Sequence, residues 1–534
     1  MEIITRLFAF VLNGLGIIVN KLLDLLQPRK NPTYPGITNP LLTKSVIELS
    51  TELRRGVISS VDLVKAYIAR VREVNPSLNA VIEERFDAAL QDAKLADDLI
   101  AKASSQYDRV ALYTRYPILG IPFTVKESCS VKGLSYTVGS VIRTNMKAPK
   151  DGDVVELLRA AGGIPLLVSA NPEFCMSFET NSVLLGRCVN PYDLNRTSAG
   201  SSGGEAALNG SGASPFGVGS DISGSIRLPS MFCGVFGHKP TGGLTSVKGH
   251  FPYSSNDENF NSLLQIGPIT RFARDLPLLL EIMAGGNKEK LKMEEPLELK
   301  DIKIYYAYGY SGLNHLTHPI VDFDVKMSIT KAVKCFEKAG LQTKELDLKF
   351  LSNSFELALV GLLDIKGLPS VVTQQSHRQP SMRLLVIEQF NSIIGHSLFT
   401  KEAIFLELMQ RLNALMATGN MQQYRDETKQ IKEHMINLLG ENGVLFMPTF
   451  HTSALCFNTS LVNVPGIDNL LLFNILGLPA THVTMGLNSR GLPIGFQVIA
   501  APFKDKLCLK IAMELEGAFN GWVPPVPHQF TPAK

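Results

Sequence analysis

The sequence lacks the side-chain patterns that commonly hold metals and phosphates. Its 7 cysteines include no C-x-x-C pair and its 10 histidines no H-E-x-x-H motif, so no metal and no other cofactor is expected. No Gly-Lys-Ser or Gly-Lys-Thr occurs, which excludes a phosphate-binding P-loop. The odd number of scattered cysteines argues against a disulfide framework and indicates a main domain that faces a reducing compartment.

An excess of charge is missing as well. The 52 Lys and Arg residues nearly balance the 49 Asp and Glu residues, leaving a net charge of +3. No basic cluster with interleaved aromatic side chains occurs, so nucleic acid is not an expected partner. No Pro/Ser-rich linker or charge block divides the chain after residue 40, so residues 41–534 are expected to form one large domain.

A long apolar run lies at the N-terminus, at residues 7–19 (LFAFVLNGLGIIV). Counted through Leu26, it reaches about twenty positions, the length of a membrane span, with Lys21 and Asp24 as interruptions. No small-residue cleavage site follows, which favours a retained membrane anchor over residues 1–28, with a linker at 29–40, over a signal peptide. The alternatives are a helix packed on the domain and a helix that mediates a homodimer.

The cations around this run indicate its orientation. Lys21, Arg29 and Lys30 follow it or lie near its end, whereas Arg6 precedes it. Positive charge is enriched on the cytosolic side of membrane anchors, so we expect the main domain in the cytosol. The expected location is an endomembrane or a lipid droplet.

Glycine and serine crowd into residues 197–229. A flexible linker of this composition would lack apolar runs, but a helix-like segment begins at Gly203 and an apolar segment follows Ile226. The remaining interpretation is a serine nucleophile with nearby backbone N–H groups. Ser202 formally matches G-x-S-x-G, yet no apolar strand precedes it, as a nucleophile elbow requires. Ser225, in the segment DISGSIR, is the favoured nucleophile.

These segments resemble the amidase signature family, on two sets of residues. The first is the Gly/Ser-rich loop followed by SDISGSIR at residues 220–227, and the second is ILGIPFTVKESCSVKGLSYTVGS at residues 118–140. The resemblance implies a triad of Lys126, Ser201 and the nucleophile Ser225, with a cis peptide bond before Ser201. It also implies an α/β fold, a single large domain whose central mixed β-sheet is covered by helices on both faces.

The implied chemistry is hydrolysis of a carboxylic amide through an acyl-serine intermediate. Lys126 would act as a base in its neutral form, which burial in an apolar strand favours, and Ser201 would carry the proton from Ser225 to Lys126. An ordinary strand-end lysine paired with Glu127 is the alternative to this role.

The resemblance also implies an oxyanion hole formed by the backbone N–H groups of Ile222, Ser223, Gly224 and Ser225. The sequence departs from the family pattern at Ser223 and Ala199, where glycine is usual or frequent. If residue 223 adopts positive φ, its Cβ costs roughly 1–2 kcal/mol and slows the enzyme.

The apolar N-terminus bears on the substrate. A retained anchor suits a substrate that dissolves in lipid, so we expect a hydrophobic small-molecule amide: a primary fatty amide or an N-acylethanolamine. The alternatives are a general or glutamine-tRNA-type amidase of the same family, and a membrane-tethered, non-catalytic lipid-binding relative. Within residues 398–416, the segment FLELMQRLNALM has a broad apolar face, for which core packing is favoured over membrane or substrate contact.

Overall fold

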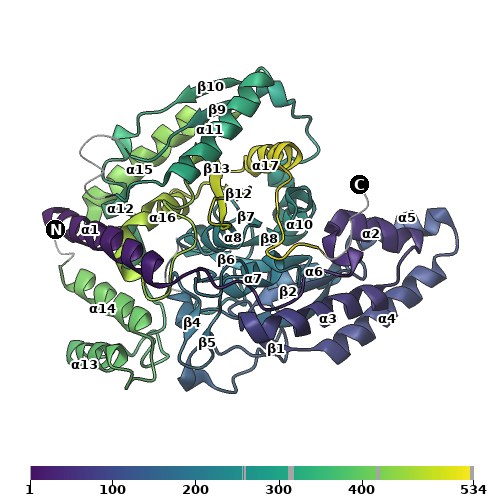
Figure 1. Cartoon of the computed structure of the whole chain (residues 1–534), viewed down its shortest axis with the longest axis horizontal. Helices are drawn as coiled ribbons and strands as arrows, with labels where there is room; N and C mark the ends of the chain where they lie inside the picture. The colour runs from purple at the N-terminus through teal and green to yellow at the C-terminus, as the bar shows by residue number, and fades with distance from the viewer. Residues whose placement is uncertain (1, 255–256, 258–259, 311–317, 417–420, 529–534) are drawn as a thin grey trace.

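The computed structural model describes residues 2–254, 257, 260–310, 318–416 and 421–528, and an eleven-stranded sheet forms its centre (Figure 1). In spatial order the strands are β1 (Val81–Glu84), β3 (Ile164–Ser169), β2 (Pro122–Lys126), β6 (Phe216–Asp221), β8 (Gln265–Thr270), β7 (Phe236–Lys239), β12 (Ala480–Leu487), β13 (Pro493–Ala500), β11 (Gly443–Met447), β9 (Lys303–Tyr306) and β10 (Gln342–Glu345). β2 is parallel to β3 and β6, and β9 is parallel to β10 and β11. The other neighbours are antiparallel, so the predicted mixed sheet is confirmed.

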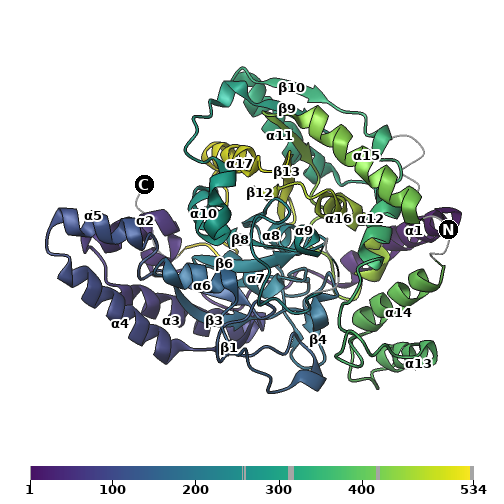
Figure 2. The same ribbon diagram turned by 180° about the vertical axis from the view of Figure 1, so that it is seen from behind.

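Helices cover both faces of this sheet, as Figures 1 and 2 show from opposite sides. They are α1 (Glu2–Leu26), α2 (Val46–Arg55), α3 (Ser60–Leu78), α4 (Phe86–Lys102), α5 (Gln106–Arg115), α6 (Asp153–Ala160), α7 (Gly203–Gly210), α8 (Arg227–Phe232), α9 (Phe260–Leu263), α10 (Leu276–Ala284), α11 (Phe323–Lys338), α12 (Ser354–Leu363), α13 (Met382–Ile393), α14 (Lys401–Met416), α15 (Met421–Leu439), α16 (Asp468–Ile475) and α17 (Asp505–Phe519). A small hairpin adds β4 (Asn181–Ser182) and β5 (Gly186–Arg187).

Strand β11 shows why the sheet needs two covered faces. Its sequence is a continuous apolar run, and successive side chains of a strand point to opposite faces. Val444 and Phe446 join a core cluster with residues of α10, α11 and α17, whereas Leu445 and Met447 join one with residues of α15 and α16. Apolar side chains on both faces of a strand are typical of a sheet buried between two helical layers.

The Gly/Ser-rich segment passes through the centre of the domain. The helix predicted after Ser202 is present as α7. Its backbone lies very close to the backbone that follows β3. A Cβ added at Gly204 would lie only 2.5 Å from the backbone nitrogen of Ala170. The glycines therefore serve close packing of backbone segments, rather than the flexibility of a linker.

Helix α1 is docked on the domain. It packs on the short 3-10 helix η9 (Leu461–Ile467), where Gly16 permits a close approach: an added Cβ would lie 2.8 Å from the carbonyl oxygen of Val462. Asp24, which interrupts the apolar run in the sequence, pairs with Arg196 and Arg490 at 2.6 Å each. Of the interpretations that the sequence left open, a helix packed on the domain therefore applies to one face of α1.

The opposite face of α1 is apolar and exposed. The segment Ala9–Leu26 has a mean hydropathy of 1.6 and only 22% of it is buried, so by length and composition it is one candidate membrane span; a signal sequence has the same properties. The exposed large apolar side chains are Phe10, Val11, Leu15, Ile17, Ile18, Leu22, Leu25 and Leu26. One face of α1 thus packs on the domain, and the domain leaves the other face exposed.

Candidate active site

The site lies at the carboxyl ends of two neighbouring parallel strands. β2 ends at Lys126, and β6 beside it continues through Ser220 to Asp221. Adjacent parallel strands present their carboxyl ends at the same edge of the sheet, so the two segments that the sequence analysis singled out meet there.

Lys126 is fully buried and contacts two hydroxyl groups. Its Nζ lies 2.6 Å from the Oγ of Ser201 and 2.9 Å from the Oγ of Ser220. The alternative pairing with Glu127 is absent, because the Glu127 carboxylate instead accepts hydrogen bonds from the backbone N–H and the hydroxyl of Thr137, at 2.8 and 2.7 Å. Lys126 and Ser201 are therefore brought together as predicted.

Ser201 follows a cis peptide bond from Gly200, also as predicted. The next residue, Ser202, is fully buried; its Oγ donates to the carbonyl oxygen of Ser220 at 3.2 Å and accepts from the Ser220 N–H at 3.3 Å. This hydroxyl is thus used in joining two backbone segments. Ser225 lines the cavity and stays the predicted nucleophile.

A buried ion pair shapes the loop that carries Ser225. The carboxylate of Asp221 accepts from the backbone N–H of Gly224 at 2.7 Å, from that of Ile226 at 3.1 Å, and from two guanidinium nitrogens of Arg227 at 3.1 Å each. Burial alone would raise the pKa of Asp221, but Arg227 lowers it to about 2. The ionised carboxylate therefore folds residues 221–227 into a tight turn.

One of the four N–H groups assigned to the oxyanion hole has another partner in the structure. The N–H of Gly224 is used by Asp221, and Gly224 does not line the cavity. Ile222, Ser223 and Ser225 line it, and their backbone N–H groups have no hydrogen-bond partner among the described residues. The role of Gly224 is conformational: its φ is +105°, and an added Cβ would lie 2.4 Å from the Cδ1 of Leu470.

The strain expected at Ser223 is absent. Ser223 is not among the residues with positive φ, so its Cβ imposes no left-handed penalty. The other departure from the family pattern, Ala199, has a φ of +64°. The left-handed conformation that strains an L-residue is therefore found at Ala199, just before the cis bond, and not at Ser223 in the loop that carries Ser225.

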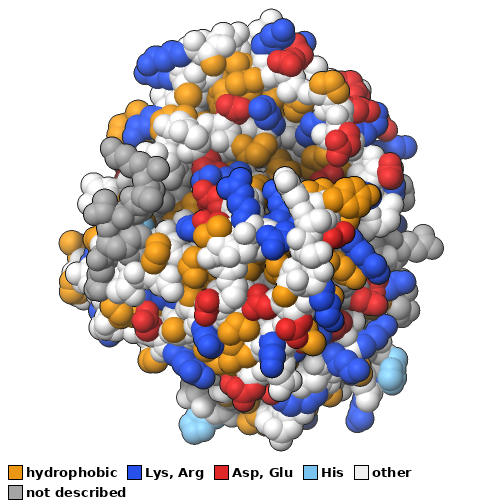
Figure 3. Space-filling model, turned by 90° about the vertical axis from the view of Figure 1, so that its right-hand side faces the viewer, with side chains coloured by type: hydrophobic (Ala, Val, Ile, Leu, Met, Phe, Trp, Pro, Cys, Tyr) orange, Lys and Arg blue, Asp and Glu red, His pale blue; other side chains and the backbone are white. Residues whose placement is uncertain are grey.

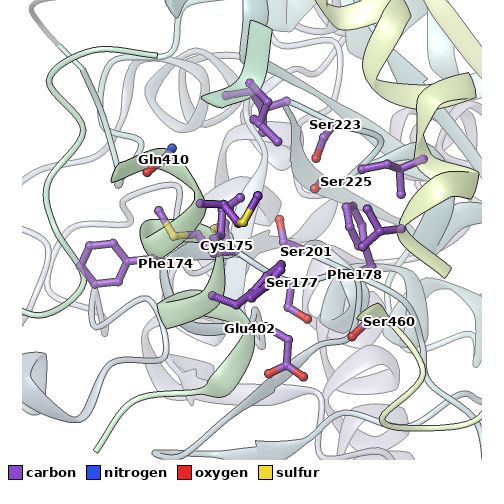
Figure 4. A pocket seen from close by; sticks show the side chains of 18 of the residues that line it. Phe174, Cys175, Ser177, Phe178, Ser201, Ser223, Ser225, Glu402, Gln410 and Ser460 are labelled. Atoms are coloured by element: carbon purple, nitrogen blue, oxygen red, sulfur yellow. The ribbon is translucent and has the colours of Figure 1, made fainter. Parts of the chain in front are cut away.

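Ser201 and Ser225 line a largely apolar cavity with a volume of about 340 Å³. Figure 4 shows the hydroxyl groups of Ser201 and Ser225 directed into it. Most of its wall is apolar. The loop at 174–178 and helices α9, α12 and α14 contribute large apolar side chains to it, namely Phe174, Phe178, Phe260, Leu359, Leu362, Phe405, Leu406 and Met409. The apolar face of α14 thus contacts the cavity, which differs from the core packing favoured by the sequence.

Sequence reasoning missed four residues of this site. Asp221 and Arg227 fall inside the quoted motif, and an acidic residue three positions before a glycine in a tight turn was the available signal. Ser220 was passed over as one of many serines. His250 gave no signal, because the contact of its Nε2 with the Oγ of Ser220, at 2.9 Å, joins residues thirty positions apart.

Comparisons with known proteins agree with this geometry. The amidase family model matches residues 62–509. The chain belongs to the amidase signature family. It is an amide-hydrolysing enzyme, as that membership implies, and the predicted family is confirmed.

Individual relatives of this amidase extend over nearly its whole length. Fatty-acid amide hydrolase 2-B from Danio rerio is 38% identical over 516 residues, covering 94% of this chain and 95% of that protein. Fatty-acid amide hydrolase 2 from Homo sapiens is 34% identical over 534 residues, covering 97% of this chain and 98% of that protein. A solved structure of fatty acid amide hydrolase matches with a TM-score of 0.68 and 19% identity, covering 91% of this chain and 86% of that one, which shows a shared fold.

Proposed function

We propose that this amidase hydrolyses fatty-acid amides, primary fatty amides and N-acylethanolamines, through an acyl-serine formed on Ser225. The observation that supports the catalytic mechanism is the buried 2.6 Å contact between Lys126 and Ser201, together with the position of Ser201 and Ser225 in the wall of the same cavity. The apolar cavity supports the substrate class, because a hydrocarbon chain gains about 0.8 kcal/mol for each methylene that it buries. The similarity to a fatty-acid amide hydrolase over 94% of the chain supports it as well.

The reaction begins with neutral Lys126 as the base. The Oγ of Ser225 attacks the amide carbonyl carbon, its proton passes to Ser201, and the proton of Ser201 passes to the Nζ of Lys126. The carbonyl oxygen becomes an oxyanion that the N–H groups of Ile222, Ser223 and Ser225 stabilise, each such donor being worth about 3 kcal/mol.

The proton held by Lys126 then goes to the leaving amine. Lys126 returns it through Ser201 to the amide nitrogen, the C–N bond breaks, and an ester remains on Ser225. Water attacks this ester and gives up a proton along the same path. When the second tetrahedral intermediate collapses, Ser225 regains its proton and the fatty acid leaves.

The test of this function is a series of primary amides with acyl chains of increasing length, assayed in detergent. We expect kcat/KM to rise with each added methylene, and Ser225→Ala and Lys126→Ala to lose activity while staying folded. Rates that do not depend on chain length would indicate a general amidase. A parent protein that hydrolyses no amide would indicate the non-catalytic lipid-binding alternative.

We propose further that the enzyme rests on a lipid surface through α1 and α13. The exposed apolar side chains of α13 and its C-terminal end are Leu384, Val386, Ile387, Phe390, Ile393 and Ile394. α1, α13 and α14 lie at the same end of the molecule in both views (Figures 1 and 2). Ile393 also lines the catalytic cavity, so an apolar substrate in the lipid would meet the cavity at this surface.

The docked face of α1 favours a helix that lies in the lipid interface over one that leaves the domain to span the membrane. Spanning would break the ion pairs of Asp24 and the hydrogen bond between Asn20 and Asn463, at 2.9 Å, and expose these polar groups to hydrocarbon. An amphipathic helix in the interface keeps them and buries the apolar face. Around α5 and α4, at the opposite end, acidic and basic side chains are interspersed (Figure 3). An endomembrane or a lipid droplet facing the cytosol is the location that we propose.

Charge substitutions on the exposed face of α1 test this attachment. We expect Leu22→Glu together with Leu26→Glu to reduce cosedimentation of the full chain with phosphatidylcholine vesicles. Leu95→Glu on α4 is the control, because the exposure of Leu95, 62%, lies between those of Leu22 and Leu26, 52% and 67%, while α4 lies at the other end of the molecule (Figure 1). Unchanged vesicle binding would overturn the proposal, and a change only in sedimentation velocity would assign α1 to a homodimer.

A further inference from the structure

Lys126, the proposed base, is the first of four groups joined by hydrogen bonds, the others being Ser220, His250 and the carbonyl group of Pro252. The Nζ of Lys126 lies 2.9 Å from the Oγ of Ser220, which lies 2.9 Å from the Nε2 of His250. The Nδ1 of His250 in turn lies 2.8 Å from the carbonyl oxygen of Pro252. All three side chains are buried, and Ser220 and His250 line the wall of the catalytic cavity.

The contact with Pro252 determines which groups in this series of hydrogen bonds donate and which accept. A carbonyl oxygen only accepts hydrogen bonds, so the Nδ1 of His250 carries the ring proton and donates it to Pro252. Burial lowers the pKa of His250 to about 3, which keeps the ring neutral. A neutral imidazole has one N–H, and its Nε2 is therefore an acceptor.

The acceptor role of the His250 Nε2 determines which groups donate in the next two hydrogen bonds, those of Ser220 and Lys126. The only hydrogen on the Oγ of Ser220 points to the Nε2 of His250, and its lone pairs face Lys126. Lys126 must donate an N–H to Ser220. The lone pair of the neutral amine remains for Ser201, whose Oγ lies 2.6 Å from the Nζ.

We propose that His250 is a positioning residue for the reaction, which keeps the lone pair of Lys126 available to Ser201 by holding the Ser220 hydroxyl away from it. This inference rests on the proposed roles of Lys126 and Ser201. Without an acceptor at position 250, the Ser220 O–H can turn to the lone pair of neutral Lys126, whose Nζ lies 2.9 Å from the Ser220 Oγ. The base would then be occupied by the wrong serine, because a buried hydroxyl without an acceptor is costly.

A double-mutant cycle separates this role from simple packing. His250→Leu removes the acceptor, and we expect kcat to fall about 10- to 100-fold with KM within about twofold of the parent. Ser220→Ala removes the hydroxyl that would be misdirected, and we expect a smaller loss. The variant that carries both substitutions should recover to the activity of Ser220→Ala, because no hydroxyl is left to compete with Ser201.

The conservative variant His250→Gln gives a second readout. Its amide oxygen can accept from Ser220, so we expect it to keep kcat within about fivefold of the parent. A double variant no more active than His250→Leu, or a glutamine variant as impaired as the leucine variant, would overturn the proposal. If His250→Leu does not fold, His250→Phe takes its place, and failure of both to fold would show that the residue serves the fold alone.

The controls distinguish this inference from the proposed function. If Ser225→Ala and Lys126→Ala remain active, the triad itself is wrong, whatever the variants at position 250 do. If both are inactive and the double-mutant cycle shows no recovery, only the role of His250 is wrong.

Discussion

Asp221 and Arg227 form a fully buried ion pair, with an N–O distance of 3.1 Å, on the loop that carries Ser225. Removing one partner of such a pair leaves the other charge buried and uncompensated. We expect Asp221→Asn to lower the free energy of unfolding by about 3–5 kcal/mol and to abolish activity by releasing the N–H of Gly224. Denaturant unfolding with intrinsic fluorescence measures the first effect.

The matched control is Asp347→Asn, which removes an exposed carboxylate that pairs with Lys349. An exposed ion pair contributes little, so this variant should unfold like the parent. If the two variants lose the same stability, the buried pair is not what holds the loop.

Ser223 provides a prediction about backbone strain. Its φ is not positive, so a glycine there relieves nothing and adds conformational freedom to the unfolded chain. We expect Ser223→Gly to leave kcat unchanged or lower and to cost about 0.5–1 kcal/mol of stability. A glycine variant with higher kcat than the parent would show that the serine does strain the loop during the reaction.

The buried carboxyl group of Glu173, next to the cavity-lining residue Phe174, is expected to make the stability of the fold depend on pH. Its Oε2 accepts from the backbone N–H of Thr400 at 2.7 Å, just before α14, while burial raises its pKa to about 7. A carboxyl group whose folded pKa is raised favours the folded state below its unfolded pKa, near 4.5, and loses that contribution as pH rises through 7. The difference is on the order of 3 kcal/mol.

Glu173→Gln removes this titration and keeps an acceptor for Thr400. We therefore expect the variant to match the parent near pH 4.5 and to be more stable than the parent at pH 8, as measured by unfolding at both values. Equal stability changes at the two pH values would mean that Glu173 does not titrate in this range.

Leu406 on α14 predicts a change in chain-length preference. It lines the cavity, so Leu406→Trp fills part of the volume that an acyl chain would occupy. We expect kcat/KM for long-chain amides to fall about tenfold or more, whereas short-chain amides are hydrolysed at close to the parent rate. The same loss for all chain lengths would place the acyl chain elsewhere.

The sequence was sufficient for the parts of the site that lie in contiguous motifs. The Gly/Ser-rich segment and the strand ending at Lys126 indicated the family, and the structure brings Lys126 to Ser201 as expected. A contiguous motif does not show which of its backbone N–H groups are free to bind a ligand. Which N–H of the 222–225 loop is free depends on the side chain of Asp221, and this depends on the fold of the loop.

Long-range contacts account for the remaining misses. The contact of Ser220 with His250 depends on how residues 250–252 return to the carboxyl end of β6, which no local pattern encodes. For α14, a broad apolar face packs equally well on a core or on a cavity wall, so periodicity alone did not distinguish the two. The docked face of α1 could not be predicted from the sequence, because Asp24 resembles an interruption of a membrane anchor until its ion pairs with Arg196 and Arg490 are known.

The acyl-serine on Ser225 is the central claim, and trapping it is the most direct test. A p-nitrophenyl ester of a long-chain fatty acid is mixed with the full-length enzyme, the reaction is stopped in acid within its first turnover, and the digested protein is examined by mass spectrometry. The account predicts one acyl group, on the peptide that contains Ser225, and none on that peptide in Lys126→Ala over the same time. An acyl group on Ser202 or on another residue, with Ser225 unmodified, would contradict it.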